Sequence, residues 1–320
     1  MLIISTLITI SSNSWMGMWM GLEINLLSII PLMNNIKNNY TAESSIKYFI
    51  IQIISSLIIL MNLIFLMKFN NFYIFNKMTN MIMNSALMMK MGSAPFHFWF
   101  PEIIEGLNWM NCFILLTWQK ISPFILLNYF LKNNIFTFII ITLNILIGGL
   151  IGLNQIKLKK LLTFSSISHI GWMLSILMLS ESLWLFYLMI YFIIMINMIY
   201  LLNKLQIFFM NHYFFMSYLM IFFFNLNFFN LIGIPPFIGF FSKWFTIQML
   251  ISYKWMFLVY FMMLFTLISF FYYFRMLILP MNLNLNKNFL MNMKINFFMF
   301  FMNFFNLFTF IFLPMISSLI

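Results

Sequence analysis

Long apolar runs fill most of the chain and are separated by short segments that contain Lys, Asn, Glu or Pro. A run of about 20 apolar residues lets an α-helix cross the ~30 Å hydrocarbon core of a bilayer. Inside lipid, only helices and closed barrels satisfy every backbone hydrogen bond. The pattern therefore predicts an all-α polytopic membrane protein with about eleven transmembrane helices. The predicted spans are residues 1–12, 14–34, 44–67, 78–99, 110–131, 134–153, 160–180, 182–203, 213–252, 255–279 and 295–318.

Two of these spans do not fit a simple crossing. Residues 1–12 are too few to cross a bilayer of ordinary thickness, whereas 213–252 is long enough for two crossings or for one broken helix. The longest polar stretch, around 281–294, is the only candidate for a flexible linker. We therefore expect a single transmembrane domain over residues 1–320.

Composition supports a chain that is solvated by lipid. Hydrophobic residues make up 64% of the 320 positions and charged residues 7%, with a mean hydropathy of +1.02, which no soluble domain of this length shows. The formal net charge is +11. In a soluble protein this charge would suggest nucleic-acid binding, but here it marks loop lysines beside membrane ends. Lipids are thus expected partners, and nucleic acid is excluded.

The distribution of loop lysines predicts the orientation of the chain. With eleven spans, the N-terminal side would hold seven lysines and the opposite side four, which places the N-terminus on the positive-inside face. The seven are Lys37, Lys157, Lys159, Lys160, Lys204, Lys287 and Lys294, and the four are Lys68, Lys77, Lys132 and Lys254.

The chain offers few ligands for a redox group. Cys112 is the only cysteine, so an intrachain disulfide and an iron–sulfur cluster are both excluded. The histidines His97, His169 and His212 are too scattered for a haem pair or a clustered metal site. No glycine-rich turn indicates a nucleotide site. We therefore expect no cofactor in this chain and no electron transfer by it.

Five charges fall inside the predicted spans, and these are Glu23, Lys47, Lys90, Lys120 and Lys243. At about 1.5 Å rise per residue, Lys120 lies roughly 18 Å along a helix from Lys132. If Lys132 marks the interface, this distance puts Lys120 near the bilayer midplane. A lysine side chain reaches about 6 Å, so the three lysines at 90, 120 and 243 cannot readily snorkel to water. Each such charge costs about 2.5–3.5 kcal/mol on insertion scales unless it faces a partner or water.

These charges predict a proton path. Loss of water disfavours the charged forms of Glu and Lys, whereas an opposite charge nearby favours them, so a buried set can exchange protons. We expect Glu23 to pair with Lys47 or Lys90, and the lysines at 90, 120 and 243 to form a hydrated lateral row. The alternative is a set of static interhelical ion pairs, but one glutamate cannot neutralise three deep lysines.

Helix-breaking residues occur at two deep segments, GSAPFHFWFP and LIGIPPFIGFFSKW. Backbone groups freed at membrane depth are tolerated only where protein or water satisfies them, and broken helices in transporters mark ion sites. The alternative for the second segment is a loop between two short spans. His169, in SSISHIGW, is a candidate relay residue, although serines and a histidine also suit helix packing.

Several long segments together resemble a known family. They are SNSWMGMWMGLEINLLSIIPL, ESSIKYFIIQ, KMGSAPFHFWFPEIIEGLNWMN, LLTWQKISPFILL, GGLIGLNQIKLKKLLTFSSISHIGWML and IGIPPFIGFFSKWFTIQ. In this order they resemble the antiporter-like membrane subunits of mitochondrial NADH dehydrogenase, the proton-pumping respiratory complex I, in an arthropod-like form. The resemblance implies eleven helices with two of them broken, other membrane-arm subunits as partners, and an N-terminus facing the matrix across the mitochondrial inner membrane.

The resemblance also assigns roles to the charges. Glu23 in GLEINLL matches the membrane glutamate of the family, Lys90 in MMKMGSAPFHFW its paired lysine, and Lys120 in TWQKISP its central lysine. Lys243 in FSKW matches the lysine after the second broken helix, where antiporter-like relatives commonly place a glutamate. Two further recurring polar positions of the family correspond to Lys47 and His169.

The expected function is proton translocation coupled to electron transfer from NADH to ubiquinone. By the resemblance, the electrons pass through flavin and iron–sulfur clusters in other subunits. Two alternatives remain open: an autonomous cation/proton antiporter, and a structural membrane subunit whose deep lysines have no role in respiration.

Overall fold

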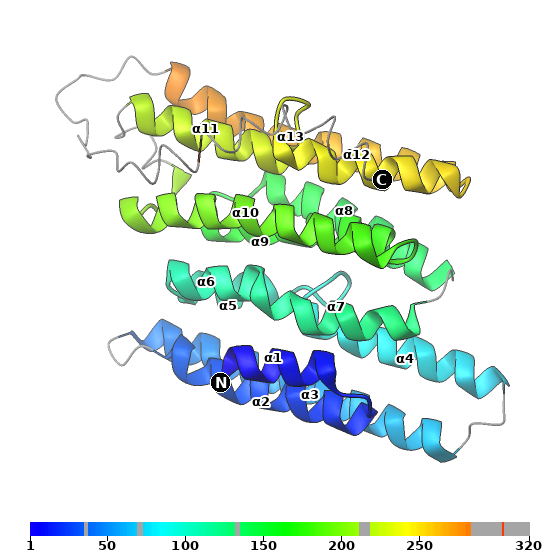
Figure 1. Ribbon diagram of the computed structural model, residues 1–320. Coiled ribbons are helices and arrows are strands. Elements are labelled where there is room, and N and C mark those ends of the chain that lie inside the picture. Colours follow the sequence, from blue (N-terminus) through cyan, green and yellow to red (C-terminus); the bar gives the residue numbers. More distant parts are fainter. Residues whose placement is uncertain (35–37, 69–72, 132–134, 211–217, 283–302, 304–320) are drawn as a thin grey trace. The chain divides into compact units, whose positions relative to one another are not determined.

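The computed structural model describes residues 1–34, 38–68, 73–131, 135–210, 218–282 and 303. These residues form thirteen helices, α1 to α13, with one isolated β-bridge between Lys157 and Phe209 (Figure 1). The prediction of an all-α protein is confirmed for this part of the chain. The predicted span 295–318, apart from Asn303, and the loop residue His212 lie outside the described residues.

The chain divides into two compact units, Met1–Asn144 and Ile145–Ile320. The first unit contains α1 (Leu2–Ser11), α2 (Trp15–Met33), α3 (Asn39–Lys68), α4 (Tyr73–Met91), α5 (Trp99–Gly106), α6 (Trp109–Leu116), α7 (Trp118–Phe130) and the first half of α8 (Ile135–Leu153). The second contains the rest of α8, α9 (Leu158–Leu177), α10 (Glu181–Leu205), α11 (Tyr218–Ile232), α12 (Ile238–Ser252) and α13 (Met256–Asn282).

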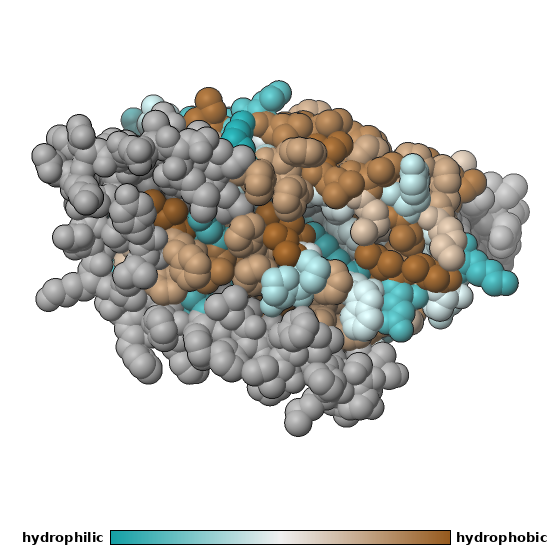
Figure 2. Space-filling view, turned by 90° about the horizontal axis from the view of Figure 1, so that it is seen from above, coloured by the Kyte–Doolittle hydropathy of each residue, from teal (hydrophilic) through white to brown (hydrophobic). Residues whose placement is uncertain are grey.

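The helices suit a membrane by length and by polarity. Among the described residues, six segments are long and apolar enough to span a bilayer: α2, α3, Trp109–Phe130 (α6 with α7), α8, α10 and Met256–Met276 of α13. Apolar side chains, in brown, cover much of the described surface in Figure 2. The chain is therefore a multi-pass membrane protein.

Helix α3 shows how the sequence sorts polar from apolar residues. Its buried side chains include Tyr48, Gln52, Ser55 and Asn62, which recur at helical spacing along one face. Between its polar ends, its exposed residues are apolar, among them Ile46, Ile50, Ile54, Leu57, Met61 and Ile64. Small and polar residues let helices approach and bond inside a membrane, while apolar residues face lipid. The helix is 30 residues long and begins at Asn39, five positions before the predicted span.

The predicted break in GSAPFHFWFP is present. Helix α4 ends at Met91, and the chain turns before α5 begins at Trp99, so the break lies inside the predicted span 78–99. Gly92 has φ +70°, which residues with a Cβ rarely adopt, and Pro95 has no N–H for a helical hydrogen bond.

The predicted break in LIGIPPFIGFFSKW is also present, between Ile232 and Ile238. Gly233 has φ +80°, and two prolines follow at 235 and 236. In Figure 1, α11 and α12 run on along one direction, which corresponds to one broken helix rather than to a loop between two crossings. The two segments pack so closely that a Cβ at Gly239 would overlap the carbonyl oxygen of Asn230.

The predicted span 110–131 is present as Trp109–Phe130, with a third interruption at Thr117 that the sequence did not predict. Thr117 has φ −120° and ψ −72°, which separates α6 from α7. Its hydroxyl donates to the carbonyl of Phe113 at 2.6 Å. Pro123 lies six residues further on and cannot donate to the carbonyl of Gln119. We attribute the irregular turn to this missing hydrogen bond, because prolines distort the turn that precedes them.

Candidate functional site

Lys90 and Lys120 line the same small cavity in the first unit. The cavity has a volume of about 10 Å³ and is also lined by Tyr48, Gln119 and four apolar or aromatic residues. Lys90 is 7% exposed and Lys120 is 2% exposed. A cavity of roughly 10–15 Å³ holds a single water if polar partners surround it, so the space between the two lysines suits one water molecule.

The first helix break positions Lys90. The residue lies in the last turn of α4, and Gln52 of α3 donates from Nε2 to the Lys90 carbonyl at 3.2 Å. This bond satisfies a backbone group that the end of the helix leaves open. Among the described residues, no oxygen lies within hydrogen-bond distance of the Lys90 ammonium group. A buried ammonium beside a polar cavity is a site for water.

The irregular turn at Thr117 positions Lys120. The lysine lies in the first turn of α7, and its backbone N–H donates to the Thr117 carbonyl at 3.2 Å. Its Nζ lies 5.8 Å from the centroid of the Phe100 ring on α5. A cation over an aromatic face is stabilised by the ring quadrupole, more so when water is excluded.

Glu23 does not form the direct ion pair that the sequence predicts. It is half-buried on α2 and interacts electrostatically with Lys90 through space, but within the described residues it makes no ion pair at 4.0 Å or less. The residue that α2 does place against the cavity wall is Asn25. Its amide exchanges two hydrogen bonds with the amide of Gln119, at 3.0 and 2.9 Å.

Lys47 contradicts its predicted pairing with Glu23. Its Nζ lies 2.9 Å from Glu43 and 3.0 Å from Glu102, and its side chain is 43% exposed. Lys47 lies two turns into α3, a helix that begins at Asn39, and α5 brings Glu102 to the same end. All three side chains are exposed, so these ion pairs belong to the rim of the unit.

Lys243 lies at the second break, in the second unit. Its Nζ donates to the carbonyl of Ile232 at 2.6 Å and approaches that of Leu231 at 3.5 Å, the last two residues of α11. The last carbonyls of a helix have no partner within the helix and carry partial negative charge. Lys243 thus caps α11, and its Nζ also lies 5.8 Å from the Trp172 ring.

His169 has a partner that the sequence did not reveal. Its Nδ1 lies 2.8 Å from the hydroxyl of Tyr187 on α10, and His169 is 5% exposed. The Tyr187 hydroxyl also interacts with the hydroxyl of Ser242, the residue before Lys243. A polar chain therefore connects His169 to the neighbour of the lysine.

The serines near His169 donate their hydroxyl protons to the backbone of α9. Ser165, Ser166 and Ser168 each bond the carbonyl three residues earlier, at 2.8, 2.7 and 2.6 Å. Such local bonds are usual for serine in a helix, and they do not require a water-lined path. The polar partner of the imidazole is on α10 instead.

The predicted hydrated row of lysines stays a prediction. Lys90 and Lys120 meet at one cavity, while Lys243 belongs to the other compact unit and its place in the row stays a prediction. In the described part of the chain, no three His, Cys, Asp or Glu side chains gather in a way that could hold a metal ion.

Comparison with known proteins places the chain in a family. The family described as NADH:quinone oxidoreductase/Mrp antiporter matches residues 12–269. NADH-ubiquinone oxidoreductase chain 2 of Anopheles gambiae is 45% identical over 294 residues, which are 90% of this chain and 86% of that one. Chain 2 of Aedes aegypti is 47% identical over the same shares, and chain 2 of Locusta migratoria is 40% identical over 86% of this chain and 81% of that one.

Solved structures share the fold at lower identity. A chain of respiratory complex I from Thermus thermophilus with bound aureothin has a TM-score of 0.79 at 20% identity, over 89% of this chain and 70% of that chain. A chain of the Mrp complex from Dietzia has a TM-score of 0.75 at 14% identity, over 86% and 58%. With the family match over residues 12–269 and the identity to chain 2 proteins, the chain belongs to the NADH-ubiquinone oxidoreductase chain 2 family, the membrane subunits of respiratory complex I.

Proposed function

We propose that this subunit moves protons along a buried axis of Glu23, Lys90, Lys120 and Lys243, coupled to electron transfer from NADH to ubiquinone in other subunits. The observation that carries the proposal is the cavity that Lys90 and Lys120 both line. Two amines that line a space of this size can exchange a proton through a single water molecule. The water accepts a proton from one lysine and donates one of its own protons to the second lysine.

The cavity makes the two lysines titrate as a pair. Two ammonium groups that share a space with little water repel each other, so a proton on one disfavours a proton on the other. Glu23 acts on Lys90 through space. A change in the charge of Glu23 therefore changes the proton occupancy of Lys90, and through it that of Lys120. The next acceptor in this proposal is Lys243 of the second unit.

The polar chain of the second unit extends the path. His169 and Tyr187 are 2.8 Å apart, and Tyr187 reaches Ser242 beside Lys243. Histidine exchanges protons near neutral pH, so we include His169 as a relay. Lys47 is left out of the path because its ion pairs with Glu43 and Glu102 are exposed.

The membrane arrangement follows from the same proposal. α4 with α5, α6 with α7, and α11 with α12 would each count as one broken crossing, and residues 295–318 would add the eleventh. The two compact units would act as one antiporter-like domain in the mitochondrial inner membrane. The loop lysines predict an N-terminus on the positive-inside face, which in this proposal is the matrix, and the other membrane-arm subunits of the complex would be the partners.

Replacement of Lys120 by Met tests the proposal. Met has a similar length and no charge, so the complex should assemble while the number of protons translocated per NADH falls. The matched control is Lys68→Met, because Lys68 is exposed at the end of α3. The measurement is proton uptake against NADH oxidation in membrane vesicles. An unchanged proton yield in Lys120→Met would refute a role for the lysine.

A second candidate is an autonomous cation/proton antiporter, favoured by the family description, which includes Mrp antiporters. Purified subunit in liposomes separates the two. Sodium or proton exchange by the isolated chain would support the antiporter, whereas exchange that requires the assembled complex supports the subunit. A purely structural role predicts normal respiration when all deep lysines are leucine.

A further inference from the structure

Gln119 both lines the lysine cavity and forms an amide pair with another helix. Its side chain lines the cavity between Lys90 and Lys120, and its amide exchanges hydrogen bonds of 3.0 and 2.9 Å with Asn25 of α2. The Tyr48 hydroxyl, also at the cavity, lies 3.5 Å from Gln119 Oε1. Neither Asn25 nor Gln119 belongs to the proposed proton path.

The pair links Glu23 to Lys120, because each of its amides belongs to a residue close in sequence to one of these charges. Asn25 lies two residues after Glu23 on α2, and Gln119 immediately precedes Lys120 on α7. Asn25 is 3% exposed, so breaking the pair would leave a buried amide without a partner, which is costly. A movement of α2 therefore moves the Gln119 amide, or else breaks the pair.

We propose that the Asn25–Gln119 pair transmits the charge state of Glu23 to the water between Lys90 and Lys120, which makes Gln119 a positioning residue. The inference rests on the proposed proton path. While Gln119 is paired, both its amide groups are bonded to Asn25, and the cavity water has the lysines and Tyr48 as partners. When α2 moves, the amide turns toward the cavity and offers the water a further donor and acceptor.

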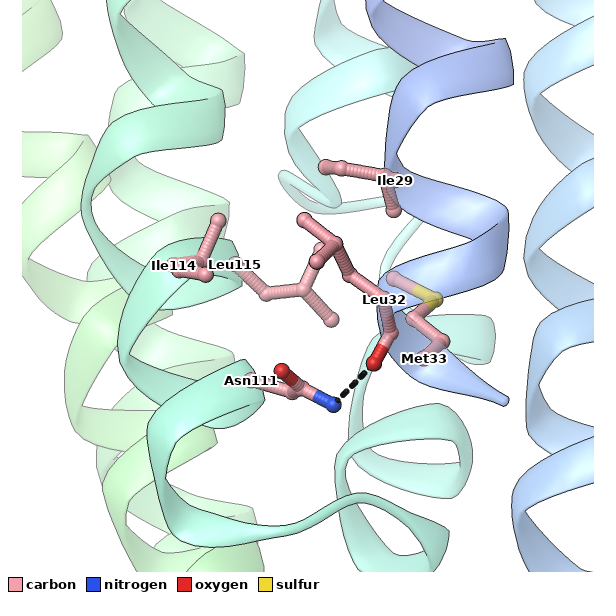
Figure 3. A pocket seen from close by; sticks show the side chains of 6 residues that line it. All are labelled: Ile29, Leu32, Met33, Asn111, Ile114 and Leu115. Carbon is pink, nitrogen blue, oxygen red and sulfur yellow. Dashed lines mark hydrogen bonds between the residues drawn. The ribbon is translucent and has the colours of Figure 1, made fainter. Parts of the chain in front are cut away.

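The structure also provides a matched control on the same side of the molecule. Asn111 of α6 donates from Nδ2 to the Leu32 carbonyl of α2 at 2.7 Å, across a small apolar pocket (Figure 3). Leu115 lines both this pocket and the lysine cavity. The Asn111 hydrogen bond thus joins α6 to the same helix, α2, but the Asn111 amide does not line the lysine cavity.

The test uses the intact respiratory complex in membrane vesicles. Asn25→Leu, Gln119→Leu and the double variant are compared for protons translocated per NADH and for the pH profile of turnover. Either leucine change removes both hydrogen bonds of the pair, and their loss corresponds to a roughly five- to hundredfold slower proton step. We expect each single variant to show this loss with a shifted pH profile, and the double variant to be no slower than either, because the residues act as one unit.

Two further variants complete the experiment. The swap Asn25→Gln with Gln119→Asn keeps both amides and their combined length, so it should restore the proton yield, and it carries the test if the leucine variants do not assemble. Asn111→Leu should leave the yield unchanged. Multiplying effects in the double variant, failure of the swap, or an equal loss in Asn111→Leu would overturn the inference.

The outcome for Lys120→Met keeps the two proposals apart. If that variant loses proton yield while Gln119→Leu retains it, the proton path stands and only the positioning role fails. If Lys120→Met retains the yield, the path itself fails.

Discussion

Lys90 of the first unit and Lys243 of the second are stabilised in different ways. Lys243 bonds the carbonyl of Ile232 at 2.6 Å and so caps a helix end, which holds an ammonium group without water. Lys90 has no hydrogen-bonding oxygen among the described residues and faces a cavity of water size. We infer that Lys90 depends on water for its charge, whereas Lys243 depends on the helix break.

Tyr187→Phe tests the relay at the residue scale. The change removes the hydroxyl that lies 2.8 Å from His169 Nδ1 and reaches Ser242. A buried group left without its partner costs about 1–3 kcal/mol, so we expect a lower melting temperature of the complex and a proton yield reduced severalfold. Tyr260→Phe is the control, because Tyr260 is exposed on α13. Equal yields in both variants would exclude His169 and Tyr187 from the path.

At this scale, sequence identified the charged residues but not their partners. A charge inside an apolar run is costly wherever it lies, so the pattern alone singles out Lys90, Lys120 and Lys243 and predicts that they lie deep in the membrane. Contacts across helices do not. Asn25 and Gln119 are 94 residues apart, and Tyr187 follows His169 by 18. Lys47 was misjudged because Glu102 approaches it only after α5 has packed against α3.

At the scale of elements, each deep lysine lies beside an irregular piece of helix. Lys90 ends α4, Lys120 begins α7 and Lys243 lies in the first turns of α12. Breaks expose backbone groups that cap, bond or hydrate a neighbouring charge. The two breaks that contain Gly and Pro were predicted from their residues. The break at Thr117 was not, because its nearest proline is six residues further along and the turn itself has ordinary residues.

Pro123→Ala tests how the irregular turn is made. Alanine supplies the N–H that can bond the Gln119 carbonyl, so the helix should become more regular from Thr117 to Lys120. We expect slower amide hydrogen exchange over residues 117–121 and a lower proton yield, since Lys120 would turn away from the cavity. Pro31→Ala, in the interior of α2, is the control for a proline removed elsewhere. Faster or unchanged exchange at 117–121 would mean that another contact fixes the turn.

At the scale of the molecule, polar side chains lie among apolar ones inside the helical units, and large apolar side chains also face outward. The single arginine is one of the polar groups that bonds within a unit. Arg275 of α13 donates from Nη1 to the carbonyl of Leu153 and from Nη2 to that of Gln155, both at 2.8 Å. It thereby bonds the end of α8 from a helix more than a hundred residues later in the chain, and stabilises the second unit.

Arg275→Leu tests this contribution. Two hydrogen bonds from a charged donor are worth about 1.5–3 kcal/mol each, so the variant should lower the melting temperature of the complex and the amount assembled. Arg275→Lys should recover only part of the loss, because a lysine cannot reach two carbonyls with a planar fork. Full recovery by lysine would show that charge alone matters at this position.

A high-resolution map of the intact complex decides whether water joins Lys90 and Lys120. We expect an ordered water within hydrogen-bond distance of both ammonium groups, in the space next to Tyr48 and Gln119. A dry space closed by apolar side chains, with the two lysines facing apart, would contradict it.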